Sequence, residues 1–100
     1  MGLSLSVLST MSFAEQASNA QAVFNDAYQN YLNAVKTKEN MQQAAEQAYT
    51  LGKAVYGDNS DNTANLAINY AKSINGYGKK WIEKRFSLYQ QAYTISVNNH

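Results

Sequence analysis

The chain has 100 residues, enough for one domain, and apolar residues make up 45% of it, enough to form a core. Its formal net charge is +1, so whole-protein charge does not point to nucleic acid or an acidic membrane as a partner. The absence of Cys excludes disulfides, thiolate metal sites and a Cys nucleophile. The chain also lacks Pro and is rich in Ala, a composition that favours several helices joined by short turns.

The first fourteen residues differ from the rest, because residues 2–14 are apolar, rich in small side chains and uncharged. This stretch resembles the apolar region of a secretory signal, and small residues at Ser12 and Ala14 suit cleavage before Glu15. No Lys or Arg precedes Lys36, so the usual basic region is missing. We predict a clipped or variant export signal, and hence a periplasmic or secreted protein.

Two other interpretations of residues 1–14 stay open. If the segment is an unstructured or partly helical leader rather than a signal, the protein is expected in the cytoplasm. Residues 1–6 also fit the loose myristoylation pattern. The segment is too short to span a bilayer as a helix, so we expect no integral membrane span.

Two helices are predicted over residues 17–36 and 40–56, because apolar residues recur there at steps of three and four. Ser18 or Asn19 is expected to cap the first helix, and the polar run that ends at Asn40 is expected to turn the chain. The periodic positions are Ala20, Val23, Phe24, Ala27, Tyr28, Tyr31, Leu32 and Val35, followed by Met41, Ala44, Ala45, Ala48, Tyr49, Leu51 and Val55.

Two more helices are predicted over residues 62–75 and 79–97. A Gly-led turn signal ends at Asp61, which is placed to cap the third helix. The run 75–78 breaks the chain again, and we interpret its Asn-Gly pair as a helix C-cap because its flanks keep the helical period. The periodic positions are Ala64, Ala67, Ile68, Ala71 and Ile74, followed by Ile82, Phe86, Tyr89 and Tyr93 with Trp81, Leu88, Ala92 and Ile95 beside them.

An internal repeat decides the fold class. Sliding the sequence against itself by 44 residues aligns residues 46–51 with 90–95 and gives nine identities among the 37 pairs of the overlap. The first helix then superposes on the third, and the second on the fourth. The sequence therefore predicts two copies of one helical hairpin, near 17–56 and 62–97, which is typical of a solenoid.

Three segments carry a family resemblance: Ala-Glu-Gln-Ala-Tyr at 45–49, the Gly-led acidic loop at 57–61 and Asn-Tyr-Ala at 69–71. Together they resemble the kinesin-light-chain type of tetratricopeptide repeat, whose repeat is longer than the ordinary 34 residues. The chain departs from that pattern in having no Pro in the loop, in Gly52 on the second helix and in an insertion at 79–83.

The resemblance implies an all-α fold, with antiparallel helical hairpins stacked as a short solenoid over residues 15–100. A weaker similarity is to exported bacterial proteins in which such repeats precede a TonB-like energy-transducing domain. This chain contains no such domain. The implied function is a scaffold that binds a partner protein or peptide; a structural self-association module and the periplasmic front part of an energy transducer are the alternatives.

Catalysis has little support in the sequence. The only His is His100, the last residue, which we expect to be mobile and therefore unable to anchor Ser–His or metal–His chemistry. Asp58 and Asp61 lie in a turn, where Asp is expected for backbone reasons. The segment resembles a calcium loop but has Thr63 and Asn69 where Gly and Glu are required. We predict neither an enzyme nor a cofactor or metal site.

The resemblance also implies that the first helix of each hairpin lines a concave groove. Polar side chains on these helices would then pair with the backbone or carboxylates of a bound extended peptide, because an Asn amide both donates and accepts. Solvent exposure alone is the alternative explanation of the polar rows. The groove candidates are Asn25, Gln29, Asn62, Asn65, Asn69 and Lys72.

The fourth helix carries more apolar residues than one face can bury against the third helix. We expect the excess to be covered by a second copy, a further repeat or domain, or a partner. Lys79, Lys80, Lys84 and Arg85 lie among these aromatics and are expected to form a solvated face rather than a nucleic-acid site. The partner-interface candidates are Trp81, Phe86, Tyr89 and Tyr93.

Overall fold

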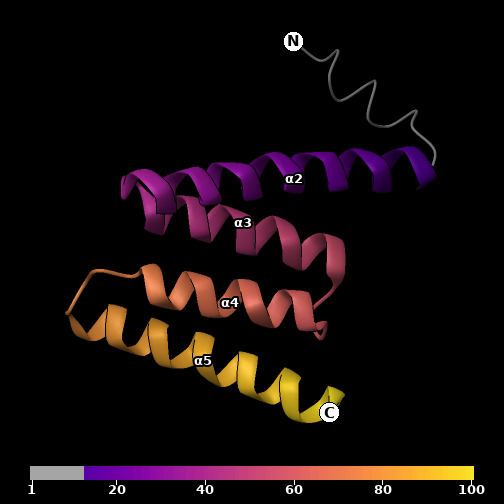
Figure 1. The fold of residues 1–100 in the computed structure, drawn as a ribbon. Coiled ribbons are helices and arrows are strands. Elements are labelled where there is room, and N and C mark those ends of the chain that lie inside the picture. The colour runs from indigo at the N-terminus through magenta and orange to yellow at the C-terminus, as the bar shows by residue number, and fades with distance from the viewer. Residues whose placement is uncertain (1–12) are drawn as a thin grey trace.

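A computed structural model describes residues 13–100, with side chains from Glu15 onward. The described part contains the helices α2 (Phe13–Thr37), α3 (Met41–Tyr56), α4 (Asp61–Ser73) and α5 (Lys79–Asn99), and no strand. Each helix packs against the next one in chain order and runs antiparallel to it (Figure 1). The predicted all-α stack of helical hairpins is confirmed. The predicted leader at 1–14 lies, apart from its last two residues, outside the described part.

The starts of two helices differ from the prediction. The first helix, α2, begins at Phe13 rather than at residue 17, so neither Ser18 nor Asn19 caps it. The N-cap of α4 is Ser60, whose Oγ accepts the backbone N–H of Thr63 at 3.1 Å. Asp61 instead occupies the first helical turn, where its negative charge complements the helix dipole. Serine and aspartate cap equally well, so residue type alone could not choose between these neighbours.

The end of α4 also differs from the prediction. The helix ends at Ser73, and Ile74 follows in an extended conformation with φ −72° and ψ 122°. The Asn-Gly pair at 75–76 therefore forms no left-handed C-cap. Ile74 is 6% exposed, so its side chain belongs to the core, and this burial accounts for an extended residue where a cap was expected.

The turn between α2 and α3 is tight because two residues adopt left-handed backbone conformations. Lys38 has φ 62° and Asn40 has φ 57°. Among residues with a Cβ, Asn adopts this region comparatively often, whereas Lys does so rarely. The predicted turn is present, and Lys38 is its most strained position.

Small residues let the helices approach closely at the centre of the stack. Ala48 on α3 is 1% exposed, and Ala67 and Ala71 on α4 are fully buried. Gly52 lies where three helices meet: an added Cβ would collide with Leu66 of α4 and would lie 2.9 Å from Phe24 Cε1 of α2. Close packing against the side chains of Leu66 and Phe24, rather than backbone conformation, therefore favours glycine at 52.

Hydrogen bonds link the helices across this core. The Tyr49 hydroxyl of α3 donates to Gln91 Oε1 of α5 at 2.7 Å, and the Tyr70 hydroxyl of α4 donates to Glu46 Oε2 of α3 at 3.1 Å. Thr63 is fully buried, and its hydroxyl donates to the carbonyl of Gly57 at 2.6 Å. No buried side-chain nitrogen or oxygen in the described part lacks a partner. The hydrogen bonds between the two hairpins therefore offset the cost of removing their polar groups from water.

Candidate functional site

A hollow of about 340 Å³ lies between the first helices of the two hairpins, α2 and α4. It has an apolar floor and a polar rim. Four of the six groove candidates lie on its rim. We call it the asparagine groove, and its lining consists of Phe24, Asn25, Tyr28, Tyr56, Asn62, Asn65, Leu66 and Asn69.

The floor of the asparagine groove is aromatic and held in place. The rings of Phe24 and Tyr28 stack with centroids 5.8 Å apart, and Tyr56 meets Phe24 edge-on at 5.3 Å. Phe24 is 6% exposed, and its ring also closes over Gly52. The floor is therefore part of the core, which gives the groove a preformed apolar surface.

The rim supplies amide groups rather than charges. Asn62, Asn65 and Asn69 follow one another at steps of three and four on α4, so they form one row. Their side-chain amides make no hydrogen bond to another described residue, whereas Asn25 Oδ1 accepts from Gln21 Nε2 at 3.0 Å. The lining contains no ionisable side chain except the two Tyr hydroxyls. Such a groove suits a neutral ligand that both donates and accepts hydrogen bonds.

The other two groove candidates lie outside this hollow. Gln29 and Lys72 are both exposed, and neither lines the asparagine groove. Gln29 follows Tyr28 by one residue and so points about 100° away around the helix axis. Lys72 lies one turn beyond Asn69, near the end of α4. The structure therefore brings together the Asn candidates and leaves these two apart.

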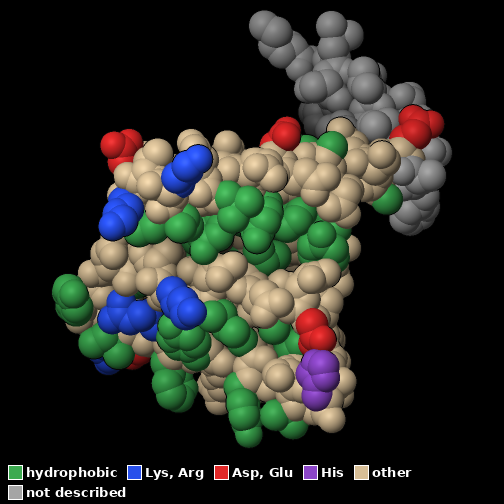
Figure 2. All heavy atoms as spheres, in the orientation of Figure 1, with side chains coloured by type: hydrophobic (Ala, Val, Ile, Leu, Met, Phe, Trp, Pro, Cys, Tyr) green, Lys and Arg blue, Asp and Glu red, His purple; other side chains and the backbone are tan. Residues whose placement is uncertain are grey.

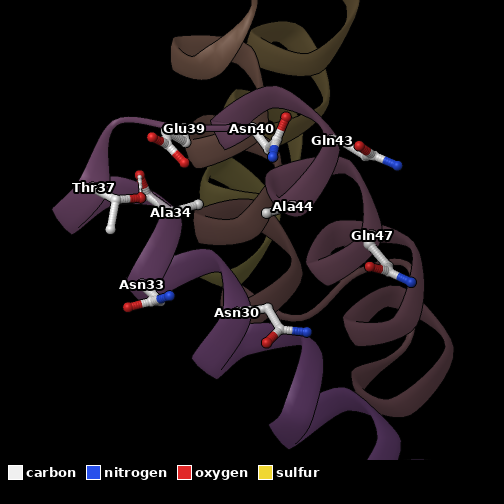
Figure 3. A pocket seen from close by; sticks show the side chains of 9 residues that line it. All are labelled: Asn30, Asn33, Ala34, Thr37, Glu39, Asn40, Gln43, Ala44 and Gln47. Carbon is white, nitrogen blue, oxygen red and sulfur yellow. Dashed lines mark hydrogen bonds between the residues drawn. The ribbon is translucent and has the colours of Figure 1, made fainter.

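A second hollow, of about 350 Å³, was not predicted from the sequence. It lies on the outer side of the first hairpin, where Asn30 and Asn33 of α2 face the same side as Gln43 and Gln47 of α3 (Figure 3). Glu39 is the only charged residue in its lining, and no aromatic residue contributes. We call it the end hollow. The sequence does carry a signal for it, because Asn30 and Asn33 are three residues apart and Gln43 and Gln47 are four apart. Apolar periodicity does not reveal this signal, because the residues are polar.

The partner-interface candidates on α5 separate into two sets. Trp81 is half-buried over the backbone of Gly76, where an added Cβ would strike its ring, and Lys80 Nζ lies 4.9 Å from the ring centroid. Phe86, Tyr89 and Tyr93 are exposed and point elsewhere. Trp81 therefore packs against the loop before α5, and only the other three remain on an open face.

That open face is a continuous stripe along α5. Five large apolar side chains on it are between 42% and 69% exposed. Figure 2 shows hydrophobic side chains protruding along the edge of the molecule that α5 forms. We call this face the outer stripe, and it consists of Ile82, Phe86, Tyr89, Tyr93 and Val97.

The titratable groups form pairs rather than a reactive cluster. His100 Nε2 lies 3.0 Å from Asp61 Oδ2, and Asn99 donates to Asp61 Oδ1 at 3.0 Å. The hydrogen bond from Asn99 and the contact with His100 lower the pKa of Asp61. α5 thus brings His100 beside a residue 39 positions away in sequence, a contact that the sequence did not predict. Both side chains of the pair are more than half exposed.

Among the described residues, Tyr70 has the pKa that departs most from its ordinary value. Burial, followed by its hydrogen bond to Glu46, raises the pKa of Tyr70 to about 12. The phenol therefore stays protonated and serves as a structural donor between α4 and α3. Within residues 13–100, no group of three or more His, Cys, Asp or Glu side chains is arranged to hold a metal ion.

Comparison with known proteins finds no matching family model, no matching curated protein and no matching solved structure. The stacked packing of the described helices is compatible with a helical repeat. None of these helices combines the length and the hydropathy that a membrane span requires. The description of the candidate site therefore depends only on the structure of this chain.

Proposed function

We propose that this chain is a protein-binding module of the tetratricopeptide kind, which holds an extended, uncharged peptide segment in the asparagine groove. The observation that carries the proposal is the meeting of Asn25, Asn62, Asn65 and Asn69 around one hollow with an apolar floor. Helices in the first position of each hairpin supply all four. The family resemblance predicts a groove on these same helices.

The spacing of the amides fits a peptide backbone. Side chains three and four apart on a helix are about 5–6 Å from each other. Alternate residues of an extended chain are about 6.6 Å apart. A peptide that runs along α4 can therefore meet Asn62, Asn65 and Asn69 with successive carbonyl or N–H groups on one edge. An apolar side chain on the other edge would contact Phe24 and Tyr28.

The binding test uses an array of uncharged, apolar-containing dodecapeptides, probed with the labelled chain. Asn69→Ala is expected to weaken binding about tenfold, because it removes one hydrogen-bonding amide from the ligand. The melting temperature should barely change, since the amide makes no hydrogen bond to the rest of the described protein. Leu66, by contrast, is 5% exposed and would be unsuitable for this test.

Asn33→Ala is the matched control, because Asn33 is exposed on α2 and lines the end hollow instead. It should leave peptide binding unchanged. Loss of binding in both variants would contradict the asparagine groove as the site. An equal loss of binding and thermal stability in Asn69→Ala would show that the residue is structural.

The setting we propose is outside the cytoplasm, and it rests on the composition of residues 1–14. Cleavage before Glu15 would remove two residues from the first turn of α2 and leave the rest of that helix intact. N-terminal sequencing of protein recovered from an export-competent bacterial host should then begin at Glu15. Recovery of uncleaved protein from the cytoplasm alone would contradict this setting.

A further inference from the structure

The outer stripe is a large apolar surface that no described residue covers. Phe86 is 68% exposed and Tyr93 is 69% exposed, and Ile82 and Val97 are more than half exposed. The core-facing residues of α5, by contrast, are Leu88, Ala92 and Ile95, each under 5% exposed. The helix therefore has two apolar faces, and α4 covers only one of them.

The internal repeat shows what normally covers such a face. At the offset of 44 residues, Tyr93 of α5 corresponds to Tyr49 of α3. Tyr49 is only 9% exposed: its ring lies 5.9 Å from that of Tyr70, and its hydroxyl bonds Gln91. The partners of Tyr49 thus come from the next hairpin, α4–α5. The outer stripe is therefore the surface on which a following helical hairpin would pack.

The opposite end of the stack is more polar than the outer stripe, although α2 also exposes Val23, Leu32 and Val35. At the same offset, the buried Thr63 and Tyr70 of α4, and Ile74 directly after it, correspond to exposed, polar positions on α2. These are Asn19, Asp26 and Asn30. Covering them with an apolar stripe would strip water from a carboxylate and two amides with no new partner. Head-to-tail stacking of identical copies is therefore unfavourable, and a polar outer face is typical of a terminal repeat.

We propose that a second copy of this chain covers the outer stripe, with the two α5 helices antiparallel about a two-fold axis near Tyr89. The stripe is self-complementary in this arrangement. Ile82 lies opposite Val97 of the other copy, and Phe86 lies opposite Tyr93, so aliphatic meets aliphatic and aromatic meets aromatic. Such an isologous contact closes on itself and yields a dimer rather than a fibre.

Charge favours the antiparallel orientation. The first half of α5 carries four cations, Lys79, Lys80, Lys84 and Arg85, and one acid, Glu83, which pairs with Lys79 at 3.8 Å. Its second half carries no charged side chain, and His100 directly follows the helix. Asp61 lies at the C-terminal end of α5, where Asn99 and His100 contact it. The antiparallel pair brings the basic end of one copy towards this acidic end of the other. A parallel pair would place the two basic ends together.

The area is in the range that a dimer needs. Three half- to mostly exposed aromatics, of roughly 200 Å² each, and two aliphatics give an exposed stripe on the order of 600 Å². Two such faces would bury about 1,200 Å² in total, at the lower bound for specific protein–protein interfaces. The stripe is also as large as the largest apolar patch of a typical monomer, about 300–600 Å².

Sedimentation of the full chain at micromolar concentration tests the proposal. We expect a dimer, and we expect the double variant Phe86→Glu, Tyr93→Glu to weaken it about 30-fold or more, as is typical for hot-spot aromatics. Tyr77→Glu is the matched control, because Tyr77 is 87% exposed in the loop before α5, and it should leave the dimer intact. A full chain that sediments as a monomer would overturn the proposal.

Single cysteines test the geometry, because the chain has none of its own. Under a short bismaleimide crosslinker, Tyr89→Cys should give a covalent dimer. Val97→Cys alone should not, since the two copies of Val97 would be about 22 Å apart along the axis at 1.5 Å per residue. Mixing Ile82→Cys with Val97→Cys should restore the crosslink. Crosslinking of Val97→Cys alone would contradict the antiparallel arrangement.

The two proposals fail separately. Asn69→Ala lies in the asparagine groove and should leave the sedimentation of the dimer unchanged. The double variant of the outer stripe should leave the peptide affinity of each groove unchanged. A dimer that binds no peptide would therefore contradict only the proposed function, and a peptide-binding monomer would contradict only the dimer.

Discussion

Tyr49 on α3 and Tyr93 on α5 occupy equivalent positions of the internal repeat, within the shared run Gln-Ala-Tyr-Thr. Nevertheless, 9% of Tyr49 and 69% of Tyr93 is exposed. The difference comes from what lies beyond each helix: α3 is followed by a further hairpin, whereas no described helix follows α5. In a stack of repeats, the place of a side chain in the stack decides its burial, because each repeat contacts only its neighbours.

The largest effect is expected from truncating the buried tyrosine. Tyr49→Ala removes a core ring, its contact with Tyr70 and its hydrogen bond to Gln91. The free energy of unfolding should fall by about 3–4 kcal/mol, as for other large aromatic truncations. Urea unfolding followed by circular dichroism measures this change.

Tyr93→Ala is the paired measurement at the equivalent position. Its effect on the monomer should stay within about 0.5 kcal/mol, because the side chain is mostly in water. The protein concentration must be low enough that the proposed dimer is dissociated. Similar losses for Tyr49→Ala and Tyr93→Ala would show that the two copies of the repeat have the same environment, contrary to the structure.

Gly52 and Ser96 form a second pair at the repeat offset. A Cβ at Gly52 would collide with Leu66 and crowd Phe24, whereas Ser96 is exposed. Gly52→Ala is therefore expected to lower the free energy of unfolding by about 1–3 kcal/mol through overpacking, despite the higher helix propensity of Ala. Ser96→Ala should change it by less than about 0.5 kcal/mol. A stabilised Gly52→Ala variant would show that α2, α3 and α4 do not meet as closely as the structure has them.

The architecture is predictable from the sequence because it depends on periodicity. Steps of three and four locate all four helices, and the same steps place Asn62, Asn65 and Asn69 in one row on the third of them. The outer stripe is predictable in the same way, since α5 carries more apolar residues than one face can bury. Local patterns thus suffice for the elements and for residues that share a helix face.

The remaining features depend on contacts between distant parts of the chain. Two contacts join segments that no local pattern relates. They are the contact of Asp61 with His100, and the hydrogen bond from Arg85 to the loop before α5. Ile74 ends α4 in an extended conformation because its side chain is drawn into the core, which overrides the Asn-Gly cap signal. The sequence groups Trp81 with the exposed aromatics, because its packing over Gly76 depends on the path of that loop.

The two hairpin loops also differ. The first is a tight turn, whereas the second, at 74–78, is held by Arg85, whose Nη1 donates to the carbonyls of Ile74 at 3.1 Å and Gly76 at 2.7 Å. Arg85→Met keeps the apolar stem and removes both bonds, so we expect a loss of about 1–2 kcal/mol in unfolding free energy. Lys84→Met is the control, because Lys84 only lies over the Tyr70 ring at 5.7 Å and should cost under about 1 kcal/mol. Equal losses for Arg85→Met and Lys84→Met would mean that the two hydrogen bonds of Arg85 add nothing to stability beyond the effect of removing a positive charge.

The smallest expected effect changes sign between the two copies of the repeat. Lys38 follows the last residue of α2 and holds φ 62°, a conformation in which glycine avoids the Cβ penalty. Lys38→Gly should therefore raise the free energy of unfolding by about 0.5 kcal/mol, whereas Lys38→Ala, which keeps a Cβ, should not. At the repeat offset, Lys38 corresponds to Ile82, which lies within α5.

Ile82→Gly should lower the stability of the monomer by about 0.5–1 kcal/mol, as glycine does in a helix interior. Thermal unfolding of the Lys38 and Ile82 variants in parallel checks the sign. A destabilised Lys38→Gly variant would place residue 38 in an ordinary right-handed turn of α2. In the structure, the second copy of the repeat is helical at residue 82, whereas the first copy turns at the equivalent residue 38. A destabilised Lys38→Gly variant would mean that the two copies differ less at this position than the structure shows.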